Sequence, residues 1–155
     1  MRVQLVRAAA TAVVAGMLAA GIFSTGAQAA DGMKMSGWLP YWLMNTSTTD
    51  AVSNSDLFED VSPFWFDAQV ESSKTSSVGI MSNSLSWGTR PAILSSLQQN
   101  GIKVLPSITD GTPARHMASV LATPDKRAAF VGQITALVNN NGYDGIDLDF
   151  EKFAF

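Results

Sequence analysis

The chain has 155 residues, of which 46% are hydrophobic and 15% are charged, and its formal net charge is −3. It contains no cysteine, which excludes a disulfide framework and a thiolate metal site. The acidic balance argues against nucleic acid or an anionic membrane surface as the partner.

Residues 1–30 have the features of a secretory signal peptide. Arg2 and Arg7 form a basic start, residues 8–23 form an apolar run without a charge, and residues 27–29 (AQA) supply the small side chains of a cleavage site. The run is short and rich in Ala and Gly for a membrane span, and a retained N-terminal anchor is the alternative. We therefore expect a secreted protein that is cleaved near Ala29 or Ala30.

Cleavage would leave residues 31–155 as the mature domain. Its net charge would be −5, because two of the ten basic residues and none of the thirteen acidic ones are removed. The remaining chain is long enough for one domain of ordinary size, held by its core rather than by disulfides. We expect no contact with nucleic acid, and none with a membrane after the signal segment is removed.

Strands and helices are predicted to alternate along the mature chain. Runs rich in β-branched and aromatic residues predict strands at 36–42, 61–67, 102–109 and 143–151. Apolar faces at helical spacing, with Pro near the start and Gly at the end, predict helices at 90–100, at a short segment opened by Thr112 and Pro113, and from Thr123 to Gly142. Residues 45–56 read as a polar loop, and the Ser-rich residues 69–87 as a small hairpin or an irregular excursion. This alternation predicts an α/β fold with a parallel sheet.

The last predicted strand carries four acidic residues within eight positions. Because side chains alternate between the two faces of a strand, three of the acids share one face: Asp147, Asp149 and Glu151. The apolar residues between and beside them would face covering helices: Ile146, Leu148 and Phe150. Asp144 has the opposite parity and lies at the entrance to the strand.

Such a row of carboxylates, spaced about 6–7 Å apart, suits proton transfer. Neighbouring like charges raise one another's pKa, so that one carboxyl stays protonated while another is ionised. Glu151 lies nearest the C-terminal end of the strand, where parallel barrels carry their active sites, and is therefore the candidate general acid. Two alternatives remain open at this point: a divalent-metal site, and a solvated edge strand whose charges prevent aggregation.

The segment D-G-I-D-L-D-F-E at residues 144–151 resembles the D-x-x-D-x-D-x-E signature of glycoside hydrolase family 18, which includes chitinases and peptidoglycan- or spore-cortex-acting glucosaminidases. The resemblance extends to GWLPYW at 37–42, VSPFWFDA at 61–68 and GIKVLPSITD at 101–110. Where family chitinases typically carry S-x-G-G, at the end of the third strand, this chain has P-S-I-T-D-G at 106–111.

The resemblance implies a (β/α)₈ barrel and a retaining, substrate-assisted mechanism without metal or cofactor. Glu151 would protonate the glycosidic oxygen, and the substrate's own 2-acetamido oxygen would attack the anomeric carbon. Asp149 would hold the acetamido N–H, and Asp147 would be its buried, proton-sharing partner. Asp144 would be a structural member of the signature.

Four further residues are candidates for contact with substrate. Trp42 and Trp65 carry aromatic faces of the kind that stack on pyranose rings, although aromatic residues more often pack in cores. Asp67 and Asp110 each follow a strand at the end where barrel sites form, although an acid in such a loop more often caps the next element.

A barrel of this type needs roughly 250 residues, so four strands correspond to the first half of one. We therefore expect residues 31–155 to be the N-terminal part of a family 18 catalytic domain, truncated after its fourth strand. The expected function is secreted hydrolysis of β-1,4-linked N-acetylglucosamine polymers, chitin or peptidoglycan. The alternatives are a chitinase-like carbohydrate-binding protein without turnover and a non-functional fragment.

Overall fold

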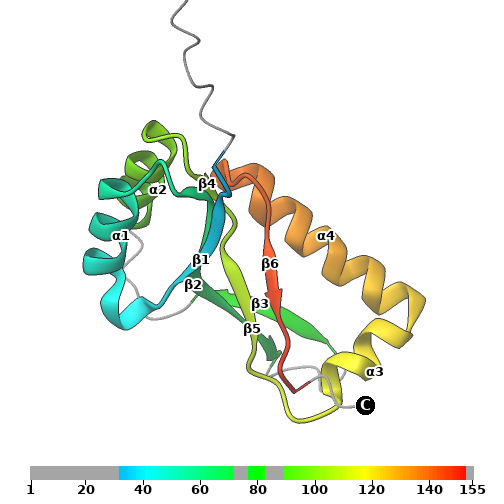
Figure 1. Ribbon diagram of the computed structural model, residues 1–155. Coiled ribbons are helices and arrows are strands. Elements are labelled where there is room, and N and C mark those ends of the chain that lie inside the picture. Colours follow the sequence, from blue (N-terminus) through cyan, green and yellow to red (C-terminus); the bar gives the residue numbers. More distant parts are fainter. Residues whose placement is uncertain (1–31, 72–76, 83–88, 153–155) are drawn as a thin grey trace, which may run out of the picture. The chain divides into compact units, whose positions relative to one another are not determined.

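The structure is a computed structural model that describes residues 32–71, 77–82 and 89–152 (Figure 1). The predicted signal peptide lies outside these residues and stays a prediction. Among the described residues, no helix is both long enough and apolar enough to cross a membrane.

A curled, mostly parallel sheet organises the chain. Its main path runs in chain order through β1 (Met35–Leu39), β2 (Phe58–Val70), β5 (Ser107–Asp110) and β6 (Asp147–Asp149), with every neighbouring pair parallel. The short β4 (Lys103–Val104) pairs in parallel with the first part of β2, and β3 (Val78–Ser82) folds back antiparallel on its last part. The predicted α/β fold is confirmed, and sequential parallel strands of this kind form the first half of a (β/α)₈ barrel.

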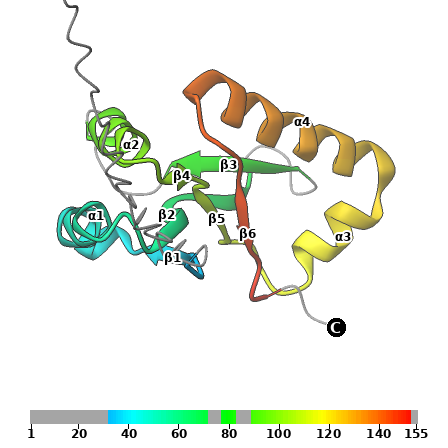
Figure 2. The ribbon, with the colours of Figure 1, turned by 45° about the horizontal axis from the view of Figure 1, so that its top comes forward.

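The helices lie in two pairs beside the sheet. Helices α1 (Met44–Ser53) and α2 (Arg90–Gln99) form one pair, while α3 (His116–Ala122) and α4 (Pro124–Asn141) form the other (Figures 1 and 2). The core between helices and sheet contains fully buried side chains from both, among them Val61, Leu97, Val104, Ile108 and Met117. Helix α4 ends where expected, because Gly142 adopts a φ of 70° that disfavours other residues.

One helix was missed by the sequence analysis. Residues 45–56 read as a polar loop, but most of this segment forms α1. Its Ser and Thr residues are poor helix formers, and the Thr49 hydroxyl donates back to the Asn45 carbonyl, as such side chains do within helices. The helix forms because Met44, Thr48 and Ala51, at helical spacing, are buried against the sheet, and packing of one face outweighs weak intrinsic propensity.

The strands are shorter than the apolar runs that predicted them. The first ends at Leu39 and is followed by a 3₁₀ turn, Tyr41–Leu43, after Pro40. The third divides into β4 and β5 around Pro106, which has no N–H to donate, and the fourth is confined to Asp147–Asp149. The hairpin considered for residues 69–87 is present as the β2–β3 pair.

A β-bulge in β2 determines which side chains reach each face of the sheet. Phe64 pairs with Ser107 and Phe66 with Ile108, so β2 uses one extra residue, Trp65, at this point. Trp65 and Phe66 are both buried, and beyond them Asp67 pairs with Thr109. We call the face that carries Ser107, Thr109, Asp147 and Asp149 the inner face, and the opposite, helix-covered face the outer face.

Candidate active site

Two rows of side chains cross the inner face. In the first row, Phe64 of β2 lies beside Ser107 of β5, which lies beside Asp147 of β6. In the second, nearer the C-terminal ends of the strands, Asp67 lies beside Thr109, which lies beside Asp149. Three of the sequence-predicted candidates, Asp67, Asp147 and Asp149, are thereby brought to one surface.

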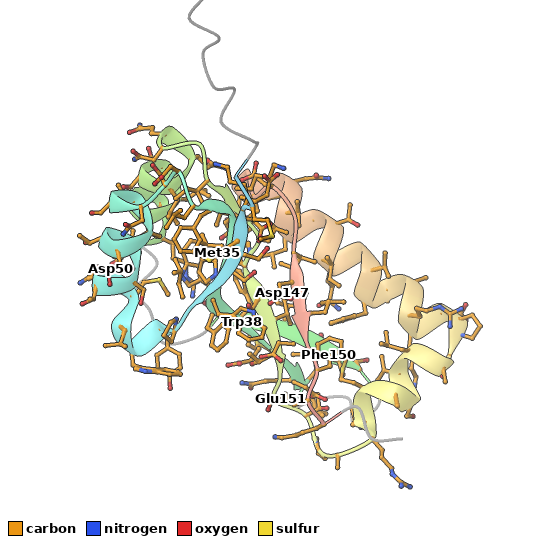
Figure 3. The ribbon with its side chains drawn as sticks, in the orientation of Figure 1. Met35, Trp38, Asp50, Asp147, Phe150 and Glu151 are labelled. Atoms are coloured by element: carbon orange, nitrogen blue, oxygen red, sulfur yellow. The ribbon has the colours of Figure 1, made fainter. Side chains whose placement is uncertain are left out.

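Asp147 is held by two hydrogen bonds from distant parts of the chain. Its Oδ2 accepts from the Ser107 hydroxyl at 2.8 Å and from the Trp38 indole Nε1 at 3.0 Å. Trp38 lies on β1, so this second bond joins the first strand of the sheet to the last across a hollow of about 410 Å³ on the inner face (Figure 3). Two donors on one oxygen fix the position and orientation of this carboxyl group.

Asp149 has a different environment. Partial burial raises the pKa of its carboxyl above the usual range, and the charges of Glu151 and Asp147 raise it further. Within the described residues its side chain makes no hydrogen bond to another group. Burial and the neighbouring charges therefore favour the protonated form of the Asp149 carboxyl more than in an exposed aspartate.

Glu151 follows β6 and is exposed. In Figure 3 it lies farther along the chain than Asp147 and Trp38, toward the end of the strand. The backbone N–H of Arg115, at the start of α3, donates to the carbonyl of the next residue, Lys152, at 3.3 Å. The loop after β5 thus contacts the segment that carries Glu151.

Asp144 lies at the opposite end of the strand and connects three elements. Its Oδ2 accepts from the backbone N–H of Val104 in β4 at 2.9 Å and from the Gln98 side chain in α2 at 3.0 Å. Its own N–H donates to the Val104 carbonyl at 3.0 Å. These bonds anchor the entrance of β6 to β4 and α2.

The side chains of Asp67 and Asp110 lie in different environments. The Asp67 carboxylate accepts a hydrogen bond from the Thr109 hydroxyl on the inner face. Asp110 is buried, and its Oδ1 accepts from the backbone N–H and the hydroxyl of Thr112 at 2.9 and 2.6 Å. Asp110 therefore stabilises the turn after β5, and the structure does not bring it into the row with Asp67 and Asp149.

The two tryptophan candidates, Trp42 and Trp65, differ in their exposure to solvent. Trp42 is 63% exposed and contacts the rings of Tyr41 and Phe64, with centroids 4.9 and 6.5 Å apart, so its face is open to a sugar. The expectation for Trp65 is wrong, because its side chain is 0% exposed. Both Trp65 and Phe66 are taken to the outer face by the bulge, where they pack against Tyr143.

The acidic row suits proton transfer better than the two alternatives. No group of three or more potential ligands in the described part of the chain has the arrangement of a metal site. β6 does lie at an edge of the described sheet, and Leu148, expected to be covered by helices, is 48% exposed. Asp147, however, is only partly exposed and is bound by two side-chain donors. Phe150 packs on Phe130 of α4 as expected.

Three residues of the site escaped the sequence analysis as candidates: Trp38, Ser107 and Thr109. Trp38 and Trp42 stand four positions apart in GWLPYW. An unbroken strand was expected there, but a 3₁₀ turn follows Pro40, and both side chains are exposed. Ser107 and Thr109 alternate in the strand that precedes the acidic one, a spacing that places two hydroxyls on one face. That alternation was the available signal.

Comparison with known proteins agrees with this geometry. The model of the glycosyl hydrolases family 18 matches residues 44–154. Solved structures with a similar fold include a chitinase from Bacteroides thetaiotaomicron, at a TM-score of 0.58 and 14% identity, covering 78% of this chain and 37% of that one. A family 18 chitinase mutant from Cycas revoluta, in complex with (GlcNAc)4, has a TM-score of 0.53 and 20% identity and covers 75% of this chain and 33% of that one. No curated protein matches. The chain thus spans about a third of the length of these chitinases.

Proposed function

The chain belongs to glycosyl hydrolases family 18, and we propose that it is a secreted, retaining glycosidase of β-1,4-linked N-acetylglucosamine polymers. The observation that carries the proposal is a difference within the acidic row: Asp147 is held in place by two hydrogen-bond donors, while the neighbouring Asp149 has a raised pKa. The (GlcNAc)4 bound to the Cycas revoluta chitinase supports this substrate class.

In the proposed mechanism, each member of the row has a separate task. Glu151, exposed at the end of the row, donates its proton to the glycosidic oxygen and then activates water as a base. The acetamido oxygen of the substrate attacks the anomeric carbon, so no side chain acts as nucleophile. Asp149 accepts the acetamido N–H and, with its raised pKa, exchanges a proton with Asp147. Trp42, with an open face, is a stacking surface for a neighbouring sugar.

Replacing Glu151 tests the assignment of the acid. Glu151→Gln keeps the shape of the side chain but has no proton to transfer, so hydrolysis of chitooligosaccharides should fall by at least about 10²-fold, the scale of general acid catalysis, while binding is retained. Turnover by reducing-end release and affinity by calorimetry separate the two effects. Glu59→Gln, at an exposed acid paired with Lys103 away from the row, is the matched control and should change neither. An active Glu151→Gln variant would contradict the assignment.

We further propose that this chain represents the N-terminal half of a longer catalytic domain. Its described residues form four parallel strands in chain order, β1, β2, β5 and β6, which correspond to half of an eight-stranded barrel. The intact mass of the protein secreted by its native host tests this and the predicted cleavage together. A mass well above that of residues 30–155 supports it, and a mass equal to that of residues 30–155 contradicts it.

Carbohydrate binding without turnover is the second candidate, favoured by the exposed rings of Trp38 and Trp42 on a chain that spans a third of its structural neighbours. Measurable affinity for chitooligosaccharides, with no product after prolonged incubation, would identify it. Turnover by this chain alone would contradict it.

A further inference from the structure

Thr109 lies between two carboxylates on the inner face. Its neighbours in the second row are Asp67 on β2 and Asp149 on β6, and adjacent strands lie about 4.8 Å apart. A threonine hydroxyl has one proton to donate, so it can serve only one of the two carboxylates at a time. In the structure it donates to Asp67.

The hydroxyl that donates to Asp67 has no second proton for Asp149, its register partner on β6. A hydroxyl that donated to Asp149 would stabilise its ionised form, whereas a hydroxyl whose proton is bound elsewhere presents only lone pairs, which favour the protonated form. The Asp149 side chain accordingly receives no hydrogen bond within the described residues.

Two local features create the arrangement. The bulge at Trp65 places Asp67 opposite Thr109, where an unbulged strand would have sent Trp65 and Asp67 to the same face. Thr109 itself stands in S-I-T-D, residues 107–110, where family chitinases typically carry S-x-G-G. A glycine at this position would offer no hydroxyl.

We propose that Asp67 and Thr109 are a pair of positioning residues, in which Asp67 holds the Thr109 hydroxyl away from Asp149 and so keeps Asp149 able to carry a proton. The benefit to turnover rests on the proposed function, because it is the glycosidase mechanism that needs a protonated partner in the row. The arrangement itself exists in the free protein and is tested there.

The charged groups that face Asp149 are few. Asp147 and Glu151 come from its own strand and the residues after it, and Asp67 lies one strand farther across the row. β5 contributes only hydroxyls to this face, those of Ser107 and Thr109, since Asp110 is buried in the turn. Replacing Asp67 therefore removes both a charge and an acceptor, and the test has to separate these two effects.

The titration of the Asp149 carboxyl, followed by carbon NMR in the full labelled chain, provides the readout. Asp67→Ala and Asp67→Asn remove the same charge, but Asn retains an oxygen that accepts from Thr109. We expect Asp67→Ala to lower the Asp149 midpoint by about one pH unit, the scale of one hydrogen bond to a carboxylate, and Asp67→Asn to lower it by less than half as much. Equal shifts in the two variants would overturn the proposal, because charge alone would then explain them.

A double-mutant cycle supplies the second criterion. Thr109→Val has no hydroxyl that could turn toward Asp149. In this background Asp67→Ala should therefore shift the Asp149 midpoint only as much as Asp67→Asn does in the wild-type background. The conservative Thr109→Ser variant should keep the wild-type midpoint. A full shift in the Thr109→Val background would contradict the proposal.

One measurement needs no variant at all. In the wild-type chain the Thr109 methyl resonance should follow the titration of Asp67 and not that of Asp149; the reverse would overturn the proposal even if Asp67→Ala failed to fold. Because none of these readouts involves turnover, absence of hydrolysis would count against the proposed function and leave this inference to be judged separately.

Discussion

The raised pKa of Asp149 suits the proposed proton exchange, but it also means that ionised Asp149 destabilises the folded state. A carboxyl whose pKa is raised in the folded state binds its proton more tightly there than in the unfolded chain. The folded state is therefore favoured fully below the unfolded pKa of about 3.9, and this contribution is lost as pH rises through the folded pKa. Above that range Asp149 is ionised at a cost to the fold.

The first prediction follows from this sign. Asp149→Asn has no charge to accommodate, so its thermal midpoint should exceed that of the wild-type chain by a few degrees at pH 7, and the difference should disappear near pH 3. Asp125→Asn is the control: Asp125 lies in the first turn of α4, where a negative charge stabilises a helix, so this change should lower the midpoint slightly at pH 7. A lower midpoint for Asp149→Asn at pH 7 would show that the row stabilises the fold.

The bulge in β2 depends on a residue of another element. Arg90, at the start of α2, is 3% exposed and donates to the Trp65 carbonyl at 3.1 Å and to the Ser82 hydroxyl of β3 at 2.5 Å. Its guanidinium lies 4.9 Å from the centroid of the Phe66 ring. Burial lowers the pKa of Arg90, although a guanidinium is not deprotonated in proteins. One side chain thus joins a helix, a hairpin and the bulge.

Replacing this arginine should be costly. Arg90→Met keeps most of the apolar stem but leaves the buried Trp65 carbonyl without this donor, which should lower the free energy of unfolding by about 1–3 kcal/mol. Urea denaturation provides the measurement. Arg127→Met is the matched control: Arg127 donates to the Leu121 carbonyl in an exposed setting, where water replaces the lost donor. If both variants lost the same free energy of unfolding, the buried hydrogen bonds of Arg90 would contribute no more to stability than the exposed one of Arg127.

A second element-level prediction concerns the entrance to α3. Arg115 adopts a φ of 66°, in the left-handed region that disfavours residues with a Cβ atom, and it is exposed. Arg115→Gly should therefore raise the free energy of unfolding by about 1 kcal/mol. Arg127→Gly, in the first turn of α4, should instead lower it, because glycine is a poor helix former. Destabilisation by Arg115→Gly would mean that the side chain makes contacts worth more than the relieved strain.

The elements show how far the sequence could predict the site. The four acids could be singled out from spacing and resemblance, because they lie within eight positions of one another, in and beside β6. The partners of Asp147 could not, since Trp38 and Ser107 are distant in sequence and only the curl of the sheet brings them to it. The opposite faces of Trp65 and Asp67 could not be predicted either, because strict alternation would put both on one face and nothing in V-S-P-F-W-F-D marks the bulge.

At the scale of the whole molecule, the described sheet has an edge at β6. This strand pairs with β5 alone among the described residues, and Leu148 on its outer face is 48% exposed. An apolar edge with unpaired backbone groups is a template for association between chains. Self-association is therefore expected to begin at this edge.

A charged side chain at position 148 should suppress self-association through the β6 edge. Leu148→Lys is expected to reduce self-association of the chain severalfold, as judged by sedimentation velocity at matched concentrations. Val131→Lys adds the same charge at a similarly exposed apolar residue of α4 and should have much less effect. Equal suppression by both variants would indicate net charge rather than the strand edge as the cause.

The bond from Trp38 to Asp147 has a consequence for the order of events in the cell. Its two residues lie 109 positions apart, so a ribosome releases the donor long before it has synthesised the acceptor. Contacts of such long range form late, after the loop between them has been ordered. The position of Asp147 in the acidic row is thus left without this support until the last strand of the described sheet has been synthesised.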